Sequence, residues 1–209
     1  MIRHHPEEAL LLDYASGAAD EGLALIVATH LCFCPACHQT VIMAEAMGGA
    51  LLDAAAPMRG DALVLALARL DDAAPVAASV PSRDGTPSPL RSLLGGDLSG
   101  VRWRAMGPKL GFFNLFRRGQ TRVRLLRGLP GADTGSHSHH GCEYTLVLQG
   151  GFTDETGSYG PGDFAVATPD VVHNPIADPG EPCINLAVTT APLKFGALIP
   201  RIAARLFGF

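Results

Sequence analysis

Residues 131–150 read GADTGSHSHHGCEYTLVLQG and combine metal-binding side chains with the beginning of a β-rich region. His137 and His139 stand two residues apart, so an extended strand points both imidazoles to the same side. Glu143 can join them from the following strand or turn, and His173 supplies a third imidazole. Surface histidines in glycine-rich loops are the alternative, and the full spacing argues against it. Three histidines and a carboxylate predict a metal site, whose donors do not choose among Zn, Mn, Fe and Ni.

The chain beyond residue 90 predicts an all-β sandwich or barrel, because short β-like runs alternate with glycine and proline. These runs are 101–105, 111–116, 121–126, 143–148, 163–167 and 184–188. Arg122 and Arg124 alternate with Val123 and Leu125, as in a half-buried strand whose arginines form a solvated face. Without interleaved aromatic residues, the arginines of this region do not predict base stacking.

A second metal-binding pattern lies near the N-terminus, where the chain reads HLCFCPAC from His30 to Cys37. His30, Cys34 and Cys37 have the type and spacing of ligands in tetrahedral zinc sites. A fourth ligand has to come from elsewhere, and His4 and His5 are the nearby imidazoles. A pair of small buried thiols and a redox Cys-x2-Cys pair are the alternatives. The histidine argues against the first, and the lack of a preceding strand argues against the second.

Helical periodicity surrounds this second pattern. Pro6 precedes two acids and starts a first helix, and Asp20 opens a second. Pro35 marks the start of a third helix, which places the two cysteines of the motif on one face. A short fourth helix is expected over 61–70. We therefore predict a multi-domain α + β fold with a helical zinc-binding bundle, a linker, an all-β barrel and a C-terminal helix. The predicted bounds are 1–71, 72–90, 91–194 and 195–209.

Composition narrows the class of protein further. The chain has 209 residues, of which 47% are hydrophobic and 17% charged, with a net charge of -4, so we expect a folded protein that does not bind nucleic acid directly. Five cysteines are too few and too unevenly spread for a secreted disulfide framework. We expect no signal peptide and no membrane span, and therefore a cytoplasmic protein. No pattern predicts a stable homo-oligomer.

The β-rich half resembles the cupin family, whose first motif, Gly-x5-His-x-His-x3-Glu-x6-Gly, matches residues 131–150 position by position. The second motif is partly kept, because Gly162 and His173 have the separation found in the family. It departs at three positions, where a proline is one residue late and two other residues replace a glycine and an asparagine: Pro169, Val171 and Ala177. The resemblance implies a β-barrel of a fold that hosts dioxygenases, isomerases and binding modules.

The helical half resembles the zinc-binding anti-sigma domain of bacteria, and the whole chain resembles the ChrR-type anti-sigma factors. The residues that match are His5, His30, Cys34 and Cys37 in the first half and His137, His139, Glu143 and His173 in the second. Family correspondence selects His5 over His4 as the fourth ligand. The resemblance implies zinc in the first domain and a second divalent metal, which we expect to be zinc, in the cupin domain.

The resemblance to ChrR-type anti-sigma factors implies that the protein is a regulator and not an enzyme, so we expect no catalytic residues. Its first domain would bind an extracytoplasmic-function sigma factor and mask the surfaces that contact RNA polymerase. Its cupin domain would be needed for the response to singlet oxygen or related oxidants. Apolar helix residues could form the sigma-binding groove or ordinary core: Leu10, Leu11, Leu23, Met43, Met47, Leu63 and Leu67. The alternative is a metal-dependent, dioxygenase-like cupin enzyme with a helical oligomerisation domain.

Overall fold

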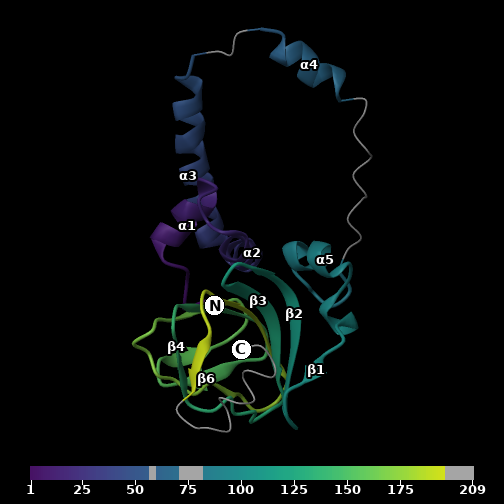
Figure 1. The fold of residues 1–209 in the computed structure, drawn as a ribbon, viewed down its shortest axis with the longest axis vertical. Coiled ribbons are helices and arrows are strands. Elements are labelled where there is room, and N and C mark those ends of the chain that lie inside the picture. Colours follow the sequence, from purple (N-terminus) through teal and green to yellow (C-terminus); the bar gives the residue numbers. More distant parts are fainter. Residues whose placement is uncertain (57–59, 71–81, 196–209) are drawn as a thin grey trace.

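The structure, a computed structural model, describes residues 1–56, 60–70 and 82–195 and places a helical region above a β-barrel (Figure 1). The predicted order of a helical part followed by a cupin-like barrel is confirmed. Residues 196–209 lie outside the described residues, and so does the C-terminal helix that we predicted there. Phe195, the first residue of that predicted helix, instead ends a strand.

The second, third and fourth helices begin within a residue of where the sequence predicts, the first begins two residues after Pro6, and a fifth was not predicted. They are α1 (Glu8–Ala15), α2 (Glu21–Leu31), α3 (Pro35–Asp53), α4 (Ala62–Ala68) and α5 (Ser88–Leu94), followed by a 3₁₀ turn at Leu98–Gly100. The Asp20 carboxylate accepts a hydrogen bond from the backbone N–H of Leu23 at 2.9 Å and caps α2. Pro35 occupies the first turn of α3, directly after Cys34. Local capping chemistry therefore sets the residues at which the metal-binding motif enters its helix.

The strands form one large sheet and two small ones. They are β1 (Arg104–Ala105), β2 (Leu110–Arg118), β3 (Thr121–Gly128), β4 (His137–His139), β5 (Glu143–Gln149), β6 (Phe152–Asp154), β7 (Gly157–Tyr159), β8 (Phe164–Ala167), β9 (Ile176–Ala177), β10 (Cys183–Thr189) and β11 (Leu193–Phe195). The large antiparallel sheet has the order β1-β2-β3-β10-β5-β8, and the small sheets have the orders β7-β6-β9 and β11-β4. Each predicted β-run overlaps one of these strands.

Helix α2 lies directly on the large sheet, so the helical and β parts share one core. Ile26 of α2 and Leu90 of α5 are fully buried against the side of the sheet that carries Val123, Leu125 and neighbouring aliphatic residues. The packing is close: a Cβ added at Gly22 would lie 2.9 Å from the side chain of Val123. The other side of the sheet faces the barrel interior and holds a second, smaller core.

The structure corrects two predictions, one about Arg124 and one about the linker. Arg124 is only 7% exposed and does not lie on a solvated face, because the opposite side of β3 is covered by α2. Its Nε donates to the side-chain oxygen of Asn114 at 3.0 Å inside the barrel. Residues 82–90 do not behave as the predicted linker either. Asp84 accepts hydrogen bonds from the N–H groups of Thr86 and Ser99, and Leu90 enters the shared core.

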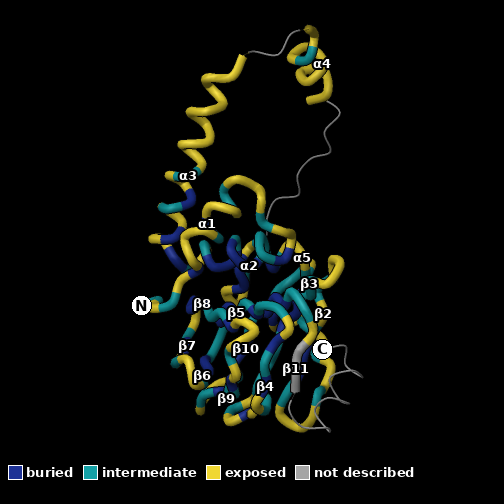
Figure 2. Tube along the Cα trace, turned by 60° about the vertical axis from the view of Figure 1, so that its left-hand side comes forward, coloured by how far each residue is buried: buried dark blue, intermediate teal, exposed yellow. Residues whose placement is uncertain are grey.

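The outer part of α3 and the whole of α4 project away from this core (Figure 2). In α3 the buried residues are Cys37 and Val41, both in its first two turns, and α4 has no buried residue. Across the described stretches of the chain, no helix is long and apolar enough to cross a membrane.

Two candidate metal centres

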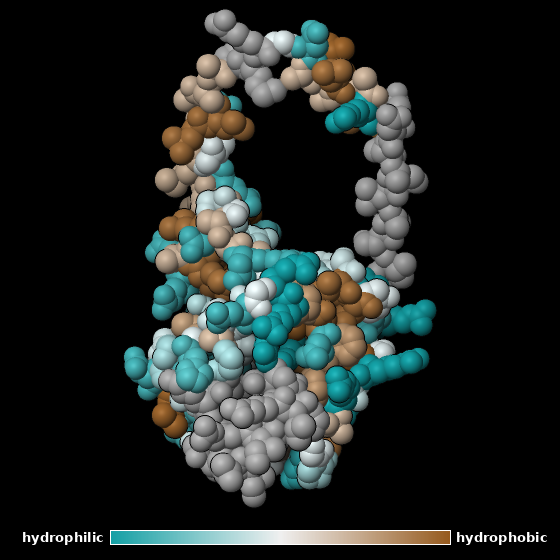
Figure 3. Space-filling view, viewed as in Figure 1, coloured by the Kyte–Doolittle hydropathy of each residue, from teal (hydrophilic) through white to brown (hydrophobic). Residues whose placement is uncertain are grey.

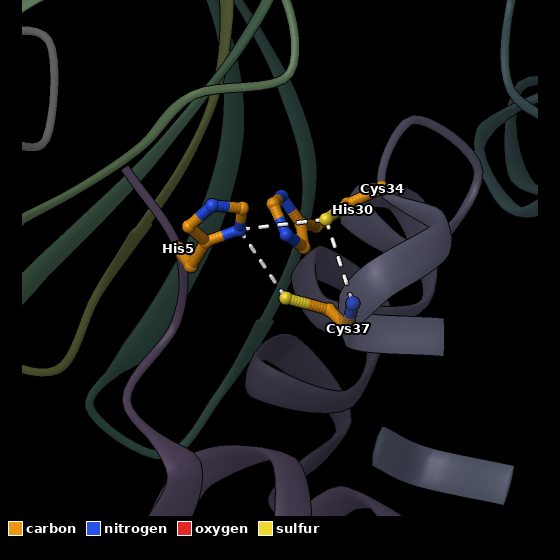
Figure 4. A group of neighbouring side chains, drawn as sticks. All are labelled: His5, His30, Cys34 and Cys37. Atoms are coloured by element: carbon orange, nitrogen blue, oxygen red, sulfur yellow. Dashed lines mark hydrogen bonds between the residues drawn. The ribbon is translucent and has the colours of Figure 1, made fainter. Parts of the chain in front are cut away.

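The first centre, here called the thiolate cluster, consists of His5, His30, Cys34 and Cys37 (Figure 4). His5 Nδ1 lies 3.4 Å from the sulfur of Cys34 and 3.4 Å from the sulfur of Cys37. One donor atom from each of the four residues fits within 4.8 Å of the others. Tetrahedral zinc with ordinary Zn–N and Zn–S bonds separates its donors by about 3.5 Å, so these distances match a zinc site. The residues come from the N-terminal segment, the end of α2 and the start of α3.

The orientation of His30 also fits a metal ligand. Its Nδ1 lies 2.9 Å from the carbonyl oxygen of Gly162, and because a carbonyl only accepts, Nδ1 carries the proton. The lone pair is therefore on Nε2, which is buried without a hydrogen-bond partner among the described residues. An unpaired buried acceptor beside two thiols is costly unless a cation binds there. We conclude that the donor set of the thiolate cluster fits zinc.

Burial sets the protonation of the thiolate cluster in the absence of a metal. It lowers the pKa of His30 to about 4, so this imidazole is neutral at physiological pH. It also raises the pKa of Cys37 to about 12, with the neighbouring Cys34 sulfur adding to the shift. Zinc needs neutral imidazoles and ionised thiols, so its binding here displaces thiol protons.

The structure places His5, and not His4, in the thiolate cluster. The centre of the His4 ring lies 4.5 Å from that of Tyr159 in the barrel, with the two rings tilted by 45°, and His4 Nδ1 lies 3.6 Å from the Asp163 carboxylate. Neighbouring residues of an extended segment point to opposite sides, so a segment that turns His4 toward the barrel turns His5 toward the thiols.

The second centre, here called the histidine cluster, consists of His137, His139, Glu143 and His173, all buried. The first two are on β4, Glu143 begins β5, and His173 is held beside His137 by a pair of backbone hydrogen bonds of 3.0 Å. The Nε2 atoms of His139 and His173 are 3.1 Å apart, and they lie 3.6 and 3.8 Å from Glu143 Oε2. Three nitrogens and one oxygen therefore converge on one point.

Hydrogen bonds from outside the histidine cluster orient two of its imidazoles. His173 Nδ1 donates to the Asp154 carboxylate at 2.9 Å, and His137 Nδ1 donates to the carbonyl oxygen of Gly135 at 2.8 Å. Both contacts leave Nε2 as the atom that faces the centre. This is the arrangement by which metal-bound histidines are held in proteins.

The electrostatics of the histidine cluster favour a cation. Burial lowers the pKa of His139 to about 3 and lowers the pKa of His137, so both imidazoles are neutral. Burial also raises the pKa of Glu143 to about 7, although His173 and Arg124 act in the opposite direction. A buried carboxylate among neutral imidazoles is stabilised by a divalent metal, and the donor set fits one.

A cavity of about 240 Å³ opens beside the histidine cluster inside the barrel. Its wall includes His137, Glu143 and His173, and most of the remaining lining is apolar, including Phe152 and Cys183. The barrel interior is therefore not completely filled by side chains next to the second centre.

Comparison with known proteins agrees with both halves of the structure. The model of the ChrR cupin-like domain family matches residues 94–193. The anti-sigma-E factor ChrR of Cereibacter sphaeroides is 38% identical over 211 residues, which cover 99% of this chain and 98% of that protein. The chain belongs to the ChrR family of anti-sigma factors.

A solved structure supports this membership. The crystal structure of Rhodobacter sphaeroides SigE in complex with the anti-sigma ChrR matches with a TM-score of 0.80 and 38% identity. The match covers 90% of this chain and 100% of the chain in that structure. The family likeness therefore extends over both the helical region and the barrel.

All eight metal ligands predicted from the sequence lie in the two clusters, while their supporting residues were missed. Nothing in the sequence marks Asp154 as a partner of a metal ligand, because residues 154–157 have the composition of a simple turn. Its other carboxylate oxygen does accept hydrogen bonds from Thr156 and Gly157 in such a turn. Gly162 was noted for its spacing from His173, although its carbonyl oxygen contacts His30, which is 132 positions away. Only the folded chain brings these groups together.

Proposed function

We propose that this protein is an anti-sigma factor that binds and inhibits an extracytoplasmic-function sigma factor. The observation that carries the proposal is the full-length likeness to ChrR, together with the match to a ChrR structure in complex with SigE. We also propose that zinc occupies the thiolate cluster and a second divalent metal, expected to be zinc, the histidine cluster. The five free cysteines support a reducing compartment, the cytoplasm.

The surface that we propose for sigma binding is the apolar arm, defined as the exposed aliphatic and methionine side chains of α3 and the region of α4. Its members are Ile42, Met43, Met47, Leu51, Leu52, Leu63, Val64, Leu65, Leu67 and Leu70. Figure 3 shows hydrophobic residues gathered along outer α3 and over α4. Exposed apolar surface of this extent is typical of a protein-binding site.

The burial of the apolar residues that the sequence left undivided between core and groove supports this choice of surface. Leu11 is buried, and Leu10 and Leu23 pack against the shared core. Met47 and Leu63, by contrast, are 71% and 70% exposed, like the other arm residues of the predicted set. The arm is therefore the part of the helical region that is available to a partner.

Zinc would support the base of this arm. The ligands of the thiolate cluster join the N-terminal segment, α2 and α3, and Cys34 and Cys37 stand at the first turn of the helix that carries half of the arm. Zinc in a small helical domain contributes folding free energy directly. Oxidation of a thiolate ligand would remove that contribution, and we propose this as one route by which singlet oxygen or a related oxidant releases the sigma factor. The metal-loaded cupin domain would be needed for that response.

The test is binding of the full chain to the extracytoplasmic-function sigma factor encoded next to its own gene. We expect a stable complex that is lost in Cys34→Ser and Cys37→Ser. Leu63→Asp combined with Leu67→Asp should weaken Kd at least about 100-fold, because two leucines buried at an interface contribute about 3 kcal/mol or more. Leu129→Asp, on an exposed barrel turn, is the matched control and should bind normally. A wild-type chain that does not bind this sigma factor refutes the proposal.

The cavity beside the histidine cluster favours one second candidate, a dioxygenase-like cupin enzyme. Three of the four cluster residues line this cavity, so a small molecule there would lie next to a bound metal. Oxygen consumption by the iron-loaded full chain with small organic substrates, lost in His139→Ala, would support this candidate. The second candidate leaves the thiolate cluster and the apolar arm unexplained, and for that reason we place it below the first.

A further inference from the structure

A turn of the barrel, Gly160–Phe164, contacts the part of the chain that carries the thiolate cluster. The carbonyl oxygen of Gly162 accepts from His30 Nδ1 at 2.9 Å. The Asp163 Oδ1 atom accepts from the backbone N–H groups of Arg3 and His4 at 2.7 and 3.0 Å. The N–H of Phe164 donates to the carbonyl oxygen of His4 at 3.0 Å. The residue that follows His4 is the cluster residue His5.

The turn is built to hold these contacts in place. Asp163 is 3% exposed, and its second oxygen accepts from the N–H of Gly160 at 2.9 Å, so the carboxylate is fixed by its own turn. Gly162 has φ +86°, and a Cβ there would lie within 2.8 Å of Ile2 and 3.0 Å of Phe33. Phe33 immediately precedes Cys34. The turn therefore touches the segments that supply His5, His30 and the first cysteine.

We infer that this barrel turn is part of the zinc site, with Asp163 acting as the positioning residue for His5 and the Gly162 carbonyl positioning His30. The inference rests on the proposed binding of zinc to the thiolate cluster. His5 belongs to a terminal segment, and such segments are poorly ordered unless they are tied down. Two charge-assisted hydrogen bonds to Asp163 tie it down on the barrel. The affinity of the helical region for zinc therefore depends on the domain behind it.

Strand β8, which begins at the last residue of this turn, also reaches the histidine cluster. β8 has four residues: Phe164 at its start bonds to the N-terminal segment, and Ala167 at its end pairs with Glu143 of β5. A displacement of β8 caused by chemistry at the histidine cluster would move Asp163 and, with it, His5. This gives the proposed oxidant response a physical path from the cupin domain to the zinc.

The experiment uses the full chain produced with cobalt in place of zinc and challenged with a graded chelator. A thiolate-to-cobalt charge-transfer band reports the thiolate cluster alone, because the histidine cluster has no sulfur donor. Asp163→Ala should lower the cobalt affinity by about 10- to 100-fold, the usual effect of removing a group that orients metal ligands. Asp97→Asn is the control: it breaks the 2.7 Å ion pair between Arg91 of α5 and Asp97, away from the thiolate cluster, and should leave the band unchanged.

A second variant makes the test independent of barrel folding. Arg3→Pro removes one of the N–H donors to Asp163 and should lower the affinity about tenfold, whereas Arg3→Ala removes only the side-chain hydrogen bond to the carbonyl oxygen of Ser158 and should not. If Asp163→Ala does not fold, the result for Arg3→Pro decides. Affinities within twofold of the wild type for the folded variants, or an equal loss in Asp97→Asn, overturn the inference. A wild-type chain without the charge-transfer band instead overturns the proposed zinc site itself.

Discussion

Replacing Ile26 by alanine tests whether the helical region and the barrel are one folding unit. Ile26 is on α2, is 0% exposed, and belongs to the same core as Val123, Leu125 and Val188 of the large sheet. The substitution removes three carbon atoms from this shared core. Their transfer free energy is about 2.4 kcal/mol, and the cavity left behind adds to it. After a small gain in helix propensity, we expect the free energy of unfolding to fall by about 3 kcal/mol.

The assay is urea unfolding of the zinc-loaded chain, followed by two probes. Trp103 is the only tryptophan in the sequence and packs against the barrel side of the shared core, so its fluorescence reports the barrel. Far-ultraviolet circular dichroism reports mainly the helices. We expect both transitions of Ile26→Ala to shift together by about 1–1.5 M urea, since about 3 kcal/mol is divided by a slope of about 2–3 kcal/mol/M.

Ile42→Ala provides the matched control, because it makes the same chemical change on α3 at a residue that is 43% exposed. It should change the free energy of unfolding by no more than about 0.5 kcal/mol. The reasoning fails if Ile26→Ala leaves the Trp103 transition at the wild-type urea concentration while the helical signal shifts. That result would mean that the two regions unfold separately despite their contact.

Three further outcomes are expected. Burial raises the pKa of Cys183 to about 12, so very little of this thiol is ionised at pH 8, and a thiol reagent should label exposed Cys32 well before buried Cys183. Because reactivity follows the thiolate, labelling of Cys183 in the folded chain should rise about tenfold per pH unit. Gly162→Ala should destabilise the chain by about 1–3 kcal/mol in thermal or urea unfolding, because its Cβ would collide with Ile2 and Phe33 at a left-handed backbone position. Removing zinc with a strong chelator should lower Tm and expose the two cysteines of the thiolate cluster to the same reagent, whereas unchanged labelling would argue against zinc there.

Local patterns in the sequence predicted most of the elements, and the residues predicted as metal ligands lie together in two clusters. The His-x-His spacing works because a strand turns alternate residues to one side, and His137 and His139 do lie together on β4. Pro35 correctly marks the start of α3, since a proline fits the first turn of a helix. These relations depend on residues close in sequence, and the chain alone contains them.

The failures all concern contacts between distant segments. Arg124 was predicted to be solvated because it alternates with apolar residues, and that pattern does not reveal that a helix covers the other side of the strand. Residues 82–90 resemble a linker in composition, but Asp84 accepts a hydrogen bond from Ser99 of the 3₁₀ turn and Leu90 packs in the core shared with the barrel. The contact between Gly162 and His30 joins two domains that the sequence presents as separate. Periodicity identifies a buried face, and only the fold identifies what covers it.

The division between a shared core and a projecting arm constrains how a sigma factor could be released. A complex with nanomolar Kd has a binding free energy of about -12 kcal/mol, and a 100-fold weakening needs about 2.8 kcal/mol. A ligand or oxidant can shift the equilibrium only by the difference between its effects on the two states. Loosening the Asp163 contacts is expected to lower the zinc affinity by about 10- to 100-fold, which corresponds to about 1.4–2.8 kcal/mol. The sigma complex is weakened by this full amount only if zinc binding and sigma binding are fully coupled. Complete loss of zinc removes about 10 kcal/mol or more. Under the proposed function, a signal that passes only through β8 would weaken the complex partially, and full release would require that the thiolate cluster lose its metal.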